Sequence, residues 1–290
     1  MKKNVWFSDL FMFVPGMLSY ILFMIVPILL CFYYAFFDWN GLNPVIHFIG
    51  FANFAEALRD KDFFHAMGVT LFMAVTATVV INCLGIFFAI LLNVKGKITN
   101  FYRSVFFFPL LISAVAVGFI WKNILSYNGL LNHFLEPFGI EKIQFLGNAT
   151  LAVLTITFVN VWQSTGFVII IYLAGLQTIP KELYDAADID GVTPWRRFKH
   201  VTFPLLAPSL TMNIIFIFTG TMREYDRVAV LTTGGPAQAS ETIAYQIVRL
   251  AFNANRFSYA SSMAVFMLIL VGILAVTLTM LLRRREESIQ

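Results

Sequence analysis

The sequence predicts an all-α integral membrane protein with six transmembrane helices. Hydrophobic residues make up 59% of the 290 residues and charged residues only 12%, whereas about a quarter of the residues of a soluble domain are charged. The charged residues cluster in a few segments, and six stretches between them are long enough, or nearly so, for a spanning helix of roughly 20 residues. These stretches lack the alternation that membrane β-strands show.

The six uncharged stretches follow one another along the whole chain. The first is much longer than the apolar core of a signal peptide, so we expect it to be a retained helix. We expect the third to extend past Lys122 to about Ser126, and the helix of the fourth to begin near Ala149. Prolines in the stretches are compatible with membrane helices where neighbours satisfy the backbone. In chain order the stretches are Leu10–Phe37, Phe63–Val94, Ser104–Trp121, Ile143–Pro180, Val201–Met222 and Phe257–Leu282.

Basic residues predict the orientation. Six spans place both termini on one side, and twelve of the 20 Lys and Arg residues then fall on that side. By the positive-inside rule it is the cytoplasmic side of the membrane. The external segments are then residues 38–62, about 127–148 and about 227–256. The basic residues concerned are Lys2, Lys3, Lys95, Lys97, Arg103, Lys181, Arg196, Arg197, Lys199, Arg283, Arg284 and Arg285.

Composition and motifs exclude several other functions. The net charge of +4 is small for this length, so we expect no nucleic-acid partner. Cys31 and Cys83 lie in apolar runs and are expected to be buried thiols. The sequence has no GxxxxGK[ST] phosphate loop, no HExxH and no Cys/His cluster. We therefore expect no catalytic residue, no metal and no cofactor, and any ATP would be bound by a partner chain.

The most informative segment is the predicted cytoplasmic loop 177–204. Pro180 suits the first turn of a helix, with Thr178 as a possible N-cap. A short helix over Lys181–Asp190 would then end at Gly191, a common helix stop.

A second short helix is expected to restart at Thr193, with Pro194 in its first turn. Trp195, Phe198 and Val201 can turn towards the membrane surface, while the neighbouring basic residues remain in water. The loop is therefore a helix–bend–helix on the cytoplasmic face.

Ala186 and Ala187 give the first helix a low-profile surface that can enter a groove on a partner. Asp185 beside them could pair with a partner arginine. The alternative is an ordinary amphipathic loop helix without a partner, and the residues alone do not decide between the two.

The loop resembles the EAA motif of ABC-importer permease subunits. That motif is Glu-Ala-Ala, three residues, Gly, nine residues, Ile, one residue and Leu-Pro. This sequence matches the spacing throughout, with conservative departures at Asp185, Val201 and Phe203. The matching positions are Asp185-Ala186-Ala187, Gly191, Val201 and Phe203-Pro204.

The resemblance implies a type I ABC importer fold and a coupling helix that docks into a cytoplasmic ATPase subunit. The ATPase-coupling residues would be Glu182, Asp185, Ala186, Ala187, Gly191 and Pro204. Asp185 would be the anionic contact, and Gly191 would supply the bend.

Other segments resemble carbohydrate-uptake permeases of the maltose and glycerol-3-phosphate type. Leu231-Thr232-Thr233-Gly234-Gly235-Pro236 is similar to their LTxGGP segment, and Tyr259-Ala260 with Ser262-Met263-Ala264 is similar to the entry of their last helix. Phe36-Asp38-Trp39 and Ile49-Gly50 with Asn53-Phe54 resemble the first member of such permease pairs. The resemblance covers nearly the whole chain in its compact six-helix form. It implies that Gly234, Gly235 and Pro236 face an external binding protein.

Polar groups within the spans are the candidates for a solute pathway, because each costs free energy in lipid. Asn160, Gln163, Ser164 and Phe167 share one helix face by their spacing of three and four. The fifth span adds Thr221 and Glu224. Hydrogen bonding between helices would explain the same residues. In the maltose-type permease a sugar-contacting Asn stands at the distance before Ile-Pro that Asn160 has here.

The sequence thus predicts the permease subunit of a binding-protein-dependent ABC importer for a carbohydrate-like solute. Its expected partners are a homologous second permease, two ATPase subunits, an extracytoplasmic solute-binding protein and membrane lipid. The domains expected are a first helix and external segment (1–66), a permease domain (67–282) and a cytoplasmic tail (283–290). The alternatives are an ion-coupled carrier that acts without an ATPase, or a membrane anchor without transport. A carrier would need buried acid or His relays, which spans one to four and six lack.

Overall fold

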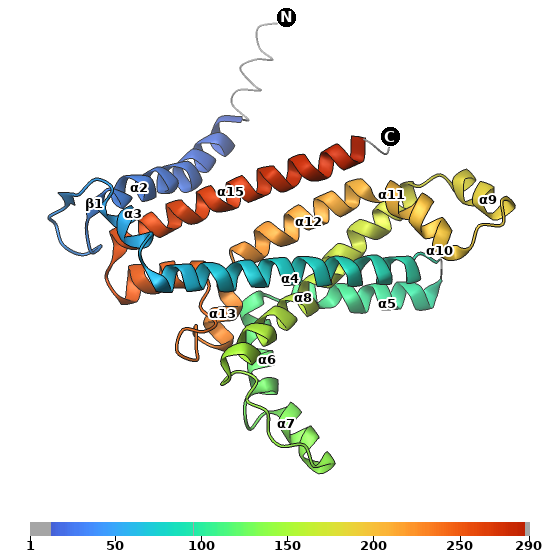
Figure 1. Cartoon of the computed structure of the whole chain (residues 1–290), viewed down its shortest axis with the longest axis horizontal. Helices are drawn as coiled ribbons and strands as arrows, with labels where there is room; N and C mark the ends of the chain where they lie inside the picture. The colour runs from blue at the N-terminus through green and yellow to red at the C-terminus, as the bar shows by residue number, and fades with distance from the viewer. Residues whose placement is uncertain (1–12, 95, 288–290) are drawn as a thin grey trace, which may run out of the picture. The chain divides into compact units, whose positions relative to one another are not determined.

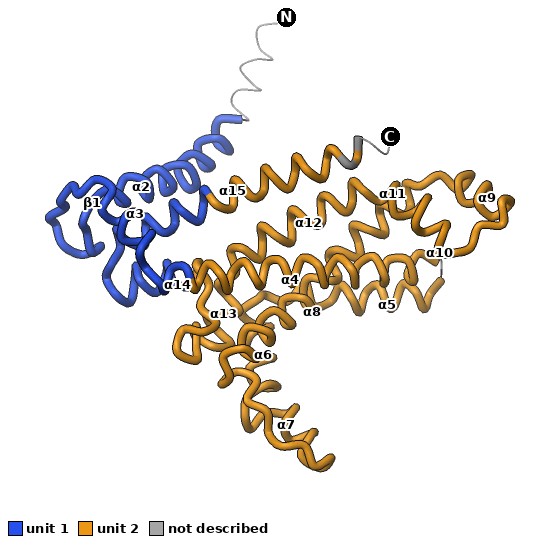
Figure 2. Tube along the Cα trace, viewed as in Figure 1, with its two compact units in different colours: residues 1–64, 246–269 blue, residues 65–245, 270–290 orange. Residues whose placement is uncertain are grey.

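The computed structural model describes residues 13–94 and 96–287 (Figure 1). Lys2, Lys3, Lys95 and residues 288–290, which the sequence assigns to the cytoplasm, lie outside the described residues. The chain divides into two compact units, one of residues 1–64 and 246–269 and the other of residues 65–245 and 270–290 (Figure 2).

The first unit contains the first membrane helix and the first external segment. A helix runs from Phe13 to Ala35 through the π-helical turn η1 (Ile21–Ile25) and α2 (Val26–Ala35). Buried Asn53 donates from Nδ2 to Ala35 O at 2.9 Å and to Phe37 O at 2.8 Å, which ties the end of α2 to the segment after it. The other elements are β1 (Phe37–Asp38), paired antiparallel with β2 (His47–Phe48), α3 (Ala52–Ala57) and η5 (Arg249–Asn253).

Long helices form the core of the second unit. They are α4 (Lys61–Leu91), α8 (Ala149–Thr178), α12 (Ala207–Met222) and α15 (Phe257–Glu287), of which α4 and α15 begin in the first unit. As predicted, the fourth span starts at Ala149, where the side chain of Asn148 caps the helix. Ile81, Tyr172 and Ile217 join α4, α8 and α12 in one apolar cluster.

The third and fifth spans are bent beside prolines, and each consists of two helical halves rather than one straight helix. The third consists of α5 (Lys97–Phe107), η2 (Phe108–Leu111) and α6 (Ala114–Leu125), and its two halves meet at 99°. Pro109 lies at the start of η2, and Ser113 restarts the chain as the N-cap of α6, accepting from Ala116 N at 3.2 Å. Proline removes a backbone donor and the serine cap favours a fresh helix start, so the local sequence explains the break.

The fifth span has the same construction. It consists of α10 (Pro194–Arg197), η4 (Phe198–Thr202) and α11 (Phe203–Leu205), followed by α12 at an angle of 67°. Pro208 in the first turn of α12 has no N–H, and its ring excludes a straight helix through Pro204, four residues earlier. Within residues 13–94 and 96–287, four helices are long and apolar enough to cross a membrane, or up to six if each bent pair is one span.

The remaining short helices lie at the two ends of the second unit. The α4–α5 turn and α9 (Lys181–Ile189) with α10 lie at one end, while α7 and α13 lie away from it (Figure 1). The basic residues of two predicted cytoplasmic segments are thus at the same end, as the positive-inside rule requires. The other short elements of the second unit are α7 (Leu130–Leu135), η3 (Glu136–Phe138) and α13 (Asp226–Leu231), whereas α14 (Ile243–Val248) is divided between the two units.

Candidate functional site: an intramembrane polar network and a cytoplasmic helix

The structure brings together the predicted polar residues of the fourth and fifth spans. Buried Asn160 on α8 donates from Nδ2 to Thr221 Oγ1 on α12 at 3.1 Å. Ser164, one turn further along α8, donates from Oγ to Asn160 Oδ1 at 2.9 Å. These three side chains form a cluster that joins α8 to α12, and it presents amide and hydroxyl groups on the helix face predicted from the spacing.

Gln163 lies on the same face but belongs to a second network. Its Nε2 donates to Ile112 O at 2.7 Å and to Pro109 O at 3.4 Å, the carbonyls beside the break in the third span. Its Oε1 accepts from Arg227 Nη2 at 2.7 Å. A broken membrane helix needs such partners for its freed backbone groups. Gln163 therefore stabilises the bend in addition to lining the predicted face.

Glu224 forms a buried ion pair with Arg227, and the two side chains are only 5% and 11% exposed. Its Oε1 also accepts from the backbone N of Arg227 at 3.2 Å, and its own carbonyl accepts from Thr242 Oγ1 at 2.6 Å. Arg227 is a network member that the sequence predictions missed. The spacing of three residues between the acid and the base was the available signal.

Phe167 completes the predicted face one turn beyond Ser164. Its ring stacks on that of Phe216 from α12, with centroids 4.5 Å apart and planes inclined by 30°. Phe167 is half-buried and Phe216 is exposed. The pair forms an aromatic surface on the two helices that the Asn160 cluster joins.

The cytoplasmic helix α9 begins at Lys181, as predicted, but its cap differs. Pro180 itself occupies the N-cap position in an extended conformation. Thr178 is not the cap, because its Oγ1 donates to Gly175 O at 2.8 Å within the end of α8. Gly191 has a φ of +65°, in the left-handed region that favours glycine. The bend predicted at Gly191 is confirmed.

The exposed face of α9 is acidic, whereas the sequence predicts that both alanines of the pair contribute to the exposed surface. Glu182, Asp185 and Ala186 are exposed, whereas Ala187 is buried against its own chain. Only Ala186 of the alanine pair is therefore available to a partner. The inner face also holds half-buried Tyr184.

Two contacts anchor α9 to the helix segment that follows it. Tyr184 Oη lies 3.3 Å from Thr202 Oγ1 on η4. Asp188 on α9 forms a 2.6 Å ion pair with Arg197 on α10. Pro204 is half-buried in α11 directly after η4. These contacts therefore connect α9 to the segment that leads directly into α12.

The second helix of the loop restarts as predicted. Thr193 is its N-cap and Pro194 its first residue. Trp195 is 69% exposed, while Phe198 and Val201 are half-buried. The segment thus keeps an apolar surface beside the cytoplasmic end of the spans.

Gly234, Gly235 and Pro236, which are predicted to face the binding protein, lie in a closed loop after α13. Gly234 is buried with a φ of +80°, and a Cβ there would lie 2.9 Å from the ring of Tyr245. Ser240 closes the loop by donating from Oγ to Gly235 O at 2.5 Å and from N to Gly234 O at 3.2 Å. Pro236 follows a cis peptide bond and is half-buried. The three residues therefore shape the loop, and exposed Ala237 and Gln238 form its outer edge.

A helical membrane bundle with bent spans, a buried polar network and a protruding cytoplasmic helix defines a membrane permease component. Comparison with known proteins identifies the family. The chain belongs to the binding-protein-dependent transport system inner membrane components, whose family model matches residues 81–288. The resemblance to ABC-importer permeases is thereby confirmed, and an ion-coupled carrier is not favoured.

Curated relatives match along nearly the whole chain. A probable starch degradation products transport system permease, AmyD of Thermoanaerobacterium thermosulfurigenes, is 31% identical over 98% of this chain and 96% of its own. The multiple sugar-binding transport system permease MsmF of Streptococcus mutans is 33% identical over 94% of both chains. The trehalose/maltose transport system permease MalF of Thermococcus litoralis is 31% identical over 93% of this chain and 91% of its own.

A solved structure shares the fold. A chain of a bacterial ABC transporter that imports the acidic polysaccharide alginate aligns with a TM-score of 0.84, 22% identity and coverage of 97% of this chain and 99% of its own. The six-span type I importer fold predicted from the sequence is confirmed.

Proposed function

We propose that the chain is the permease subunit through which a carbohydrate-like solute enters the cell, driven by ATP hydrolysis on separate ATPase subunits. A homologous second permease completes the pathway, and an extracytoplasmic binding protein delivers the solute. The chain itself performs no catalysis and binds no cofactor. Similarity at 31–33% identity to three curated permeases named for starch products, multiple sugars and trehalose/maltose carries the choice of solute class.

The polar cluster on α8 and α12 suits such a solute. Sugars offer hydroxyl groups that donate and accept, and the amide of Asn160 with the hydroxyls of Ser164 and Thr221 can do both. The Phe167–Phe216 stack offers an aromatic surface for the apolar face of a sugar ring. In the proposed cycle Asn160 exchanges its bond to Thr221 for bonds to the solute when α8 and α12 separate.

The coupling step is assigned to the exposed face of α9. Asp185 and Glu182 are exposed anions that can form charge-assisted hydrogen bonds with an ATPase arginine or lysine. The Asp188–Arg197 ion pair and the Tyr184–Thr202 contact then pass movement of α9 to η4 and α12. The Asp188–Arg197 ion pair holds α9 and α10 together across the bend at Gly191, so that the two helices move as one piece.

The test is a pull-down of the tagged chain from detergent-solubilised native membranes, with wild type beside Asp185→Arg. Glu136→Arg is the matched control, since it makes the same charge reversal at an exposed residue of the predicted external segment. We expect wild type and Glu136→Arg to recover an ATPase, a second permease and a binding protein. Asp185→Arg should lose the ATPase while retaining the second permease.

The solute class is tested separately by mass spectrometry of small molecules released from the co-purified binding protein. A mono- or oligosaccharide supports the proposal. A released amino acid or peptide would overturn the solute class, and a wild-type pull-down without an ATPase would overturn the coupling mechanism.

A further inference from the structure

An apolar groove of about 780 Å³ lies between the cytoplasmic end of α4 and the α10–α11 segment. Cys83, Ile86, Phe87 and Ile90 line it from α4, at the spacing of three and four residues that places them on one helix face. Phe198 and Phe203 line the opposite side. Neither the solute network nor the exposed face of α9 uses this groove.

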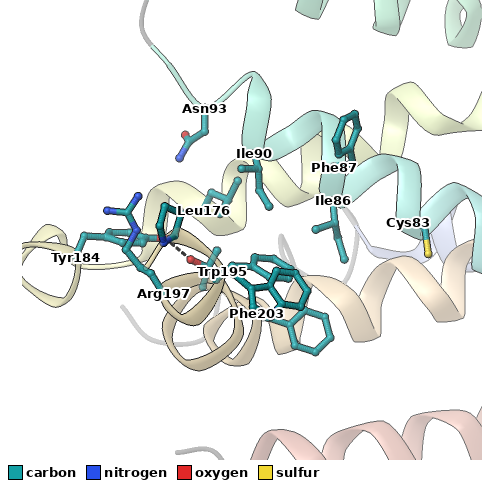
Figure 3. Close-up of a pocket in the computed structure, with 13 residues that line it drawn as sticks. Cys83, Ile86, Phe87, Ile90, Asn93, Leu176, Tyr184, Trp195, Arg197 and Phe203 are labelled. Carbon is teal, nitrogen blue, oxygen red and sulfur yellow. Dashed lines mark hydrogen bonds between the residues drawn. The ribbon is translucent and has the colours of Figure 1, made fainter. Parts of the chain in front are cut away.

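The polarity of the groove changes along its length. Figure 3 shows Cys83 at one end and Asn93, Tyr184 and Arg197 at the other. Between them α4 advances about 10 Å from Cys83 to Ile90, at 1.5 Å per residue. The polar end coincides with the end of α4 and the basic cytoplasmic segment, so it lies at the membrane surface. The apolar end points into the hydrocarbon region.

We propose that this groove binds a phospholipid of the cytoplasmic leaflet that has an anionic headgroup. Its acyl chain would lie along the Cys83–Ile90 face, and its phosphate would meet Arg197. Exposed Trp195 stands at the same end, in the position that membrane-interface tryptophans favour.

Charge complementarity supports an anionic headgroup. Arg197 offers five N–H donors in a planar fork, and its Nη1 is engaged by Asp188 at 2.6 Å. Exposed Arg196 and Lys199 stand on either side of it in the sequence. Basic residues beside the cytoplasmic leaflet attract anionic lipid. A lipid phosphate at Arg197 would bind the same guanidinium that joins α10 to α9. A lipid in the groove would therefore affect the contact that holds the coupling helix.

The test uses the complete importer, reconstituted with phosphatidylcholine and a small fraction of phosphatidylglycerol bearing a photoactivatable diazirine on its acyl chain. After illumination, mass spectrometry of peptides locates the attached lipid. The exposed face of α15 at Ile273, Val276 and Met280 serves as the internal reference for ordinary boundary lipid. A phosphatidylcholine probe with the same diazirine measures the headgroup preference.

We expect attachment on the Cys83–Ile90 face to exceed that on the α15 face, and to exceed it more for the anionic probe. Arg197→Gln should lower the anionic preference roughly fivefold, as expected for one basic residue at the membrane surface. Ile90→Trp should fill the groove and reduce attachment there, while Val276→Trp should leave the groove unchanged.

Asp188→Asn separates lipid binding from damage to the loop. It removes the same ion pair as Arg197→Gln but leaves the guanidinium in place, so anionic attachment should be retained or increased. Equal attachment on the groove and on α15, or equal attachment of the two probes, would overturn the proposal. Attachment on α15 with none in the groove would also overturn it.

Discussion

Two polar regions of the second unit differ in how their side chains find partners. The Asn160 cluster and the Gln163–Arg227–Glu224 network are buried, and their members bond mainly to one another. On α9, by contrast, Glu182 and Asp185 point away from the chain. The polar groups of the buried network are bonded within the chain. The exposed acids of α9 are available to bind another molecule.

The difference follows from the surroundings. A polar group in a membrane interior must be bonded within the protein, because lipid offers no partner. An acid at the cytoplasmic surface is hydrated and costs nothing to leave exposed. The buried polar residues must therefore be complementary to one another. The exposed residues of α9 can instead be complementary to a partner chain. The two regions should fail in different ways when mutated.

The largest effect on partner binding and transport is expected for Asp185→Arg. Loss of a charge-assisted hydrogen bond, worth about 1.5–3 kcal/mol, together with like-charge repulsion should weaken ATPase binding roughly a hundredfold. The melting temperature of the isolated subunit should not change, because Asp185 is exposed. Titration of the purified ATPase against the subunit in nanodiscs measures the affinity. An unchanged affinity would mean that α9 docks through another face.

Arg227→Leu has the largest expected effect on the stability of the subunit itself. It leaves Glu224 buried without its ion-pair partner, which costs about 3–5 kcal/mol. Thermal unfolding in detergent should show a clear fall in the melting temperature. The double variant Glu224→Leu with Arg227→Leu should recover most of the loss. If the double variant is worse than the single one, the pair stabilises the fold through contacts other than its mutual charge.

Gly166→Ala tests the close approach of α8 to the end of α5. An added Cβ would lie 2.0 Å from Phe106 O, so the helices must move apart. Overpacking of this kind costs about 1–3 kcal/mol. Gly220→Ala is the matched control, since its Cβ would meet nothing within 4 Å. Equal melting temperatures for the two variants would contradict the packing described here.

Asn160→Ala should have the smallest effect on stability. Hydrogen bonds between membrane helices are worth about 0.6 kcal/mol on average. Solute uptake should nevertheless fall, up to about tenfold, if the solute loses one hydrogen bond. Thr165→Ala is the control on the same helix, because its hydroxyl bonds only to Val161 O at 2.6 Å. Equal uptake by both variants would remove Asn160 from the pathway.

The sequence predicts the spans, their orientation and the coupling segment because these depend on local features. Hydrophobic length, basic residues and the spacing around Gly191 act over one or two helical turns. The size of the bends beside Pro109 and Pro208 was not predicted, since proline alone does not show whether a helix kinks or stops and restarts. The bent arrangement also needs distant partners, such as the Gln163 amide that bonds the carbonyls at the first break.

The site was predicted in part for the same reason. Spacing placed Asn160, Gln163 and Ser164 on one face, but it could not show that Thr221 meets Asn160 while Arg227 meets Gln163. The inward turn of Ala187 was also missed. A motif indicates which residues matter, whereas the face of a helix that remains exposed is set by what the helix packs against.

Parallel assays on Asp185→Arg and Asn160→Ala in proteoliposomes test the central claim most directly. The complete importer is reconstituted with its binding protein, and subunit composition, ATP hydrolysis and uptake are measured on each sample. We predict that Asn160→Ala retains the ATPase subunits and hydrolysis but takes up less solute. Asp185→Arg should lose the ATPase subunits, and with them hydrolysis and uptake. Loss of the same subunits in both variants, or normal uptake with Asp185→Arg, would contradict the division between a closed solute network and an open coupling face.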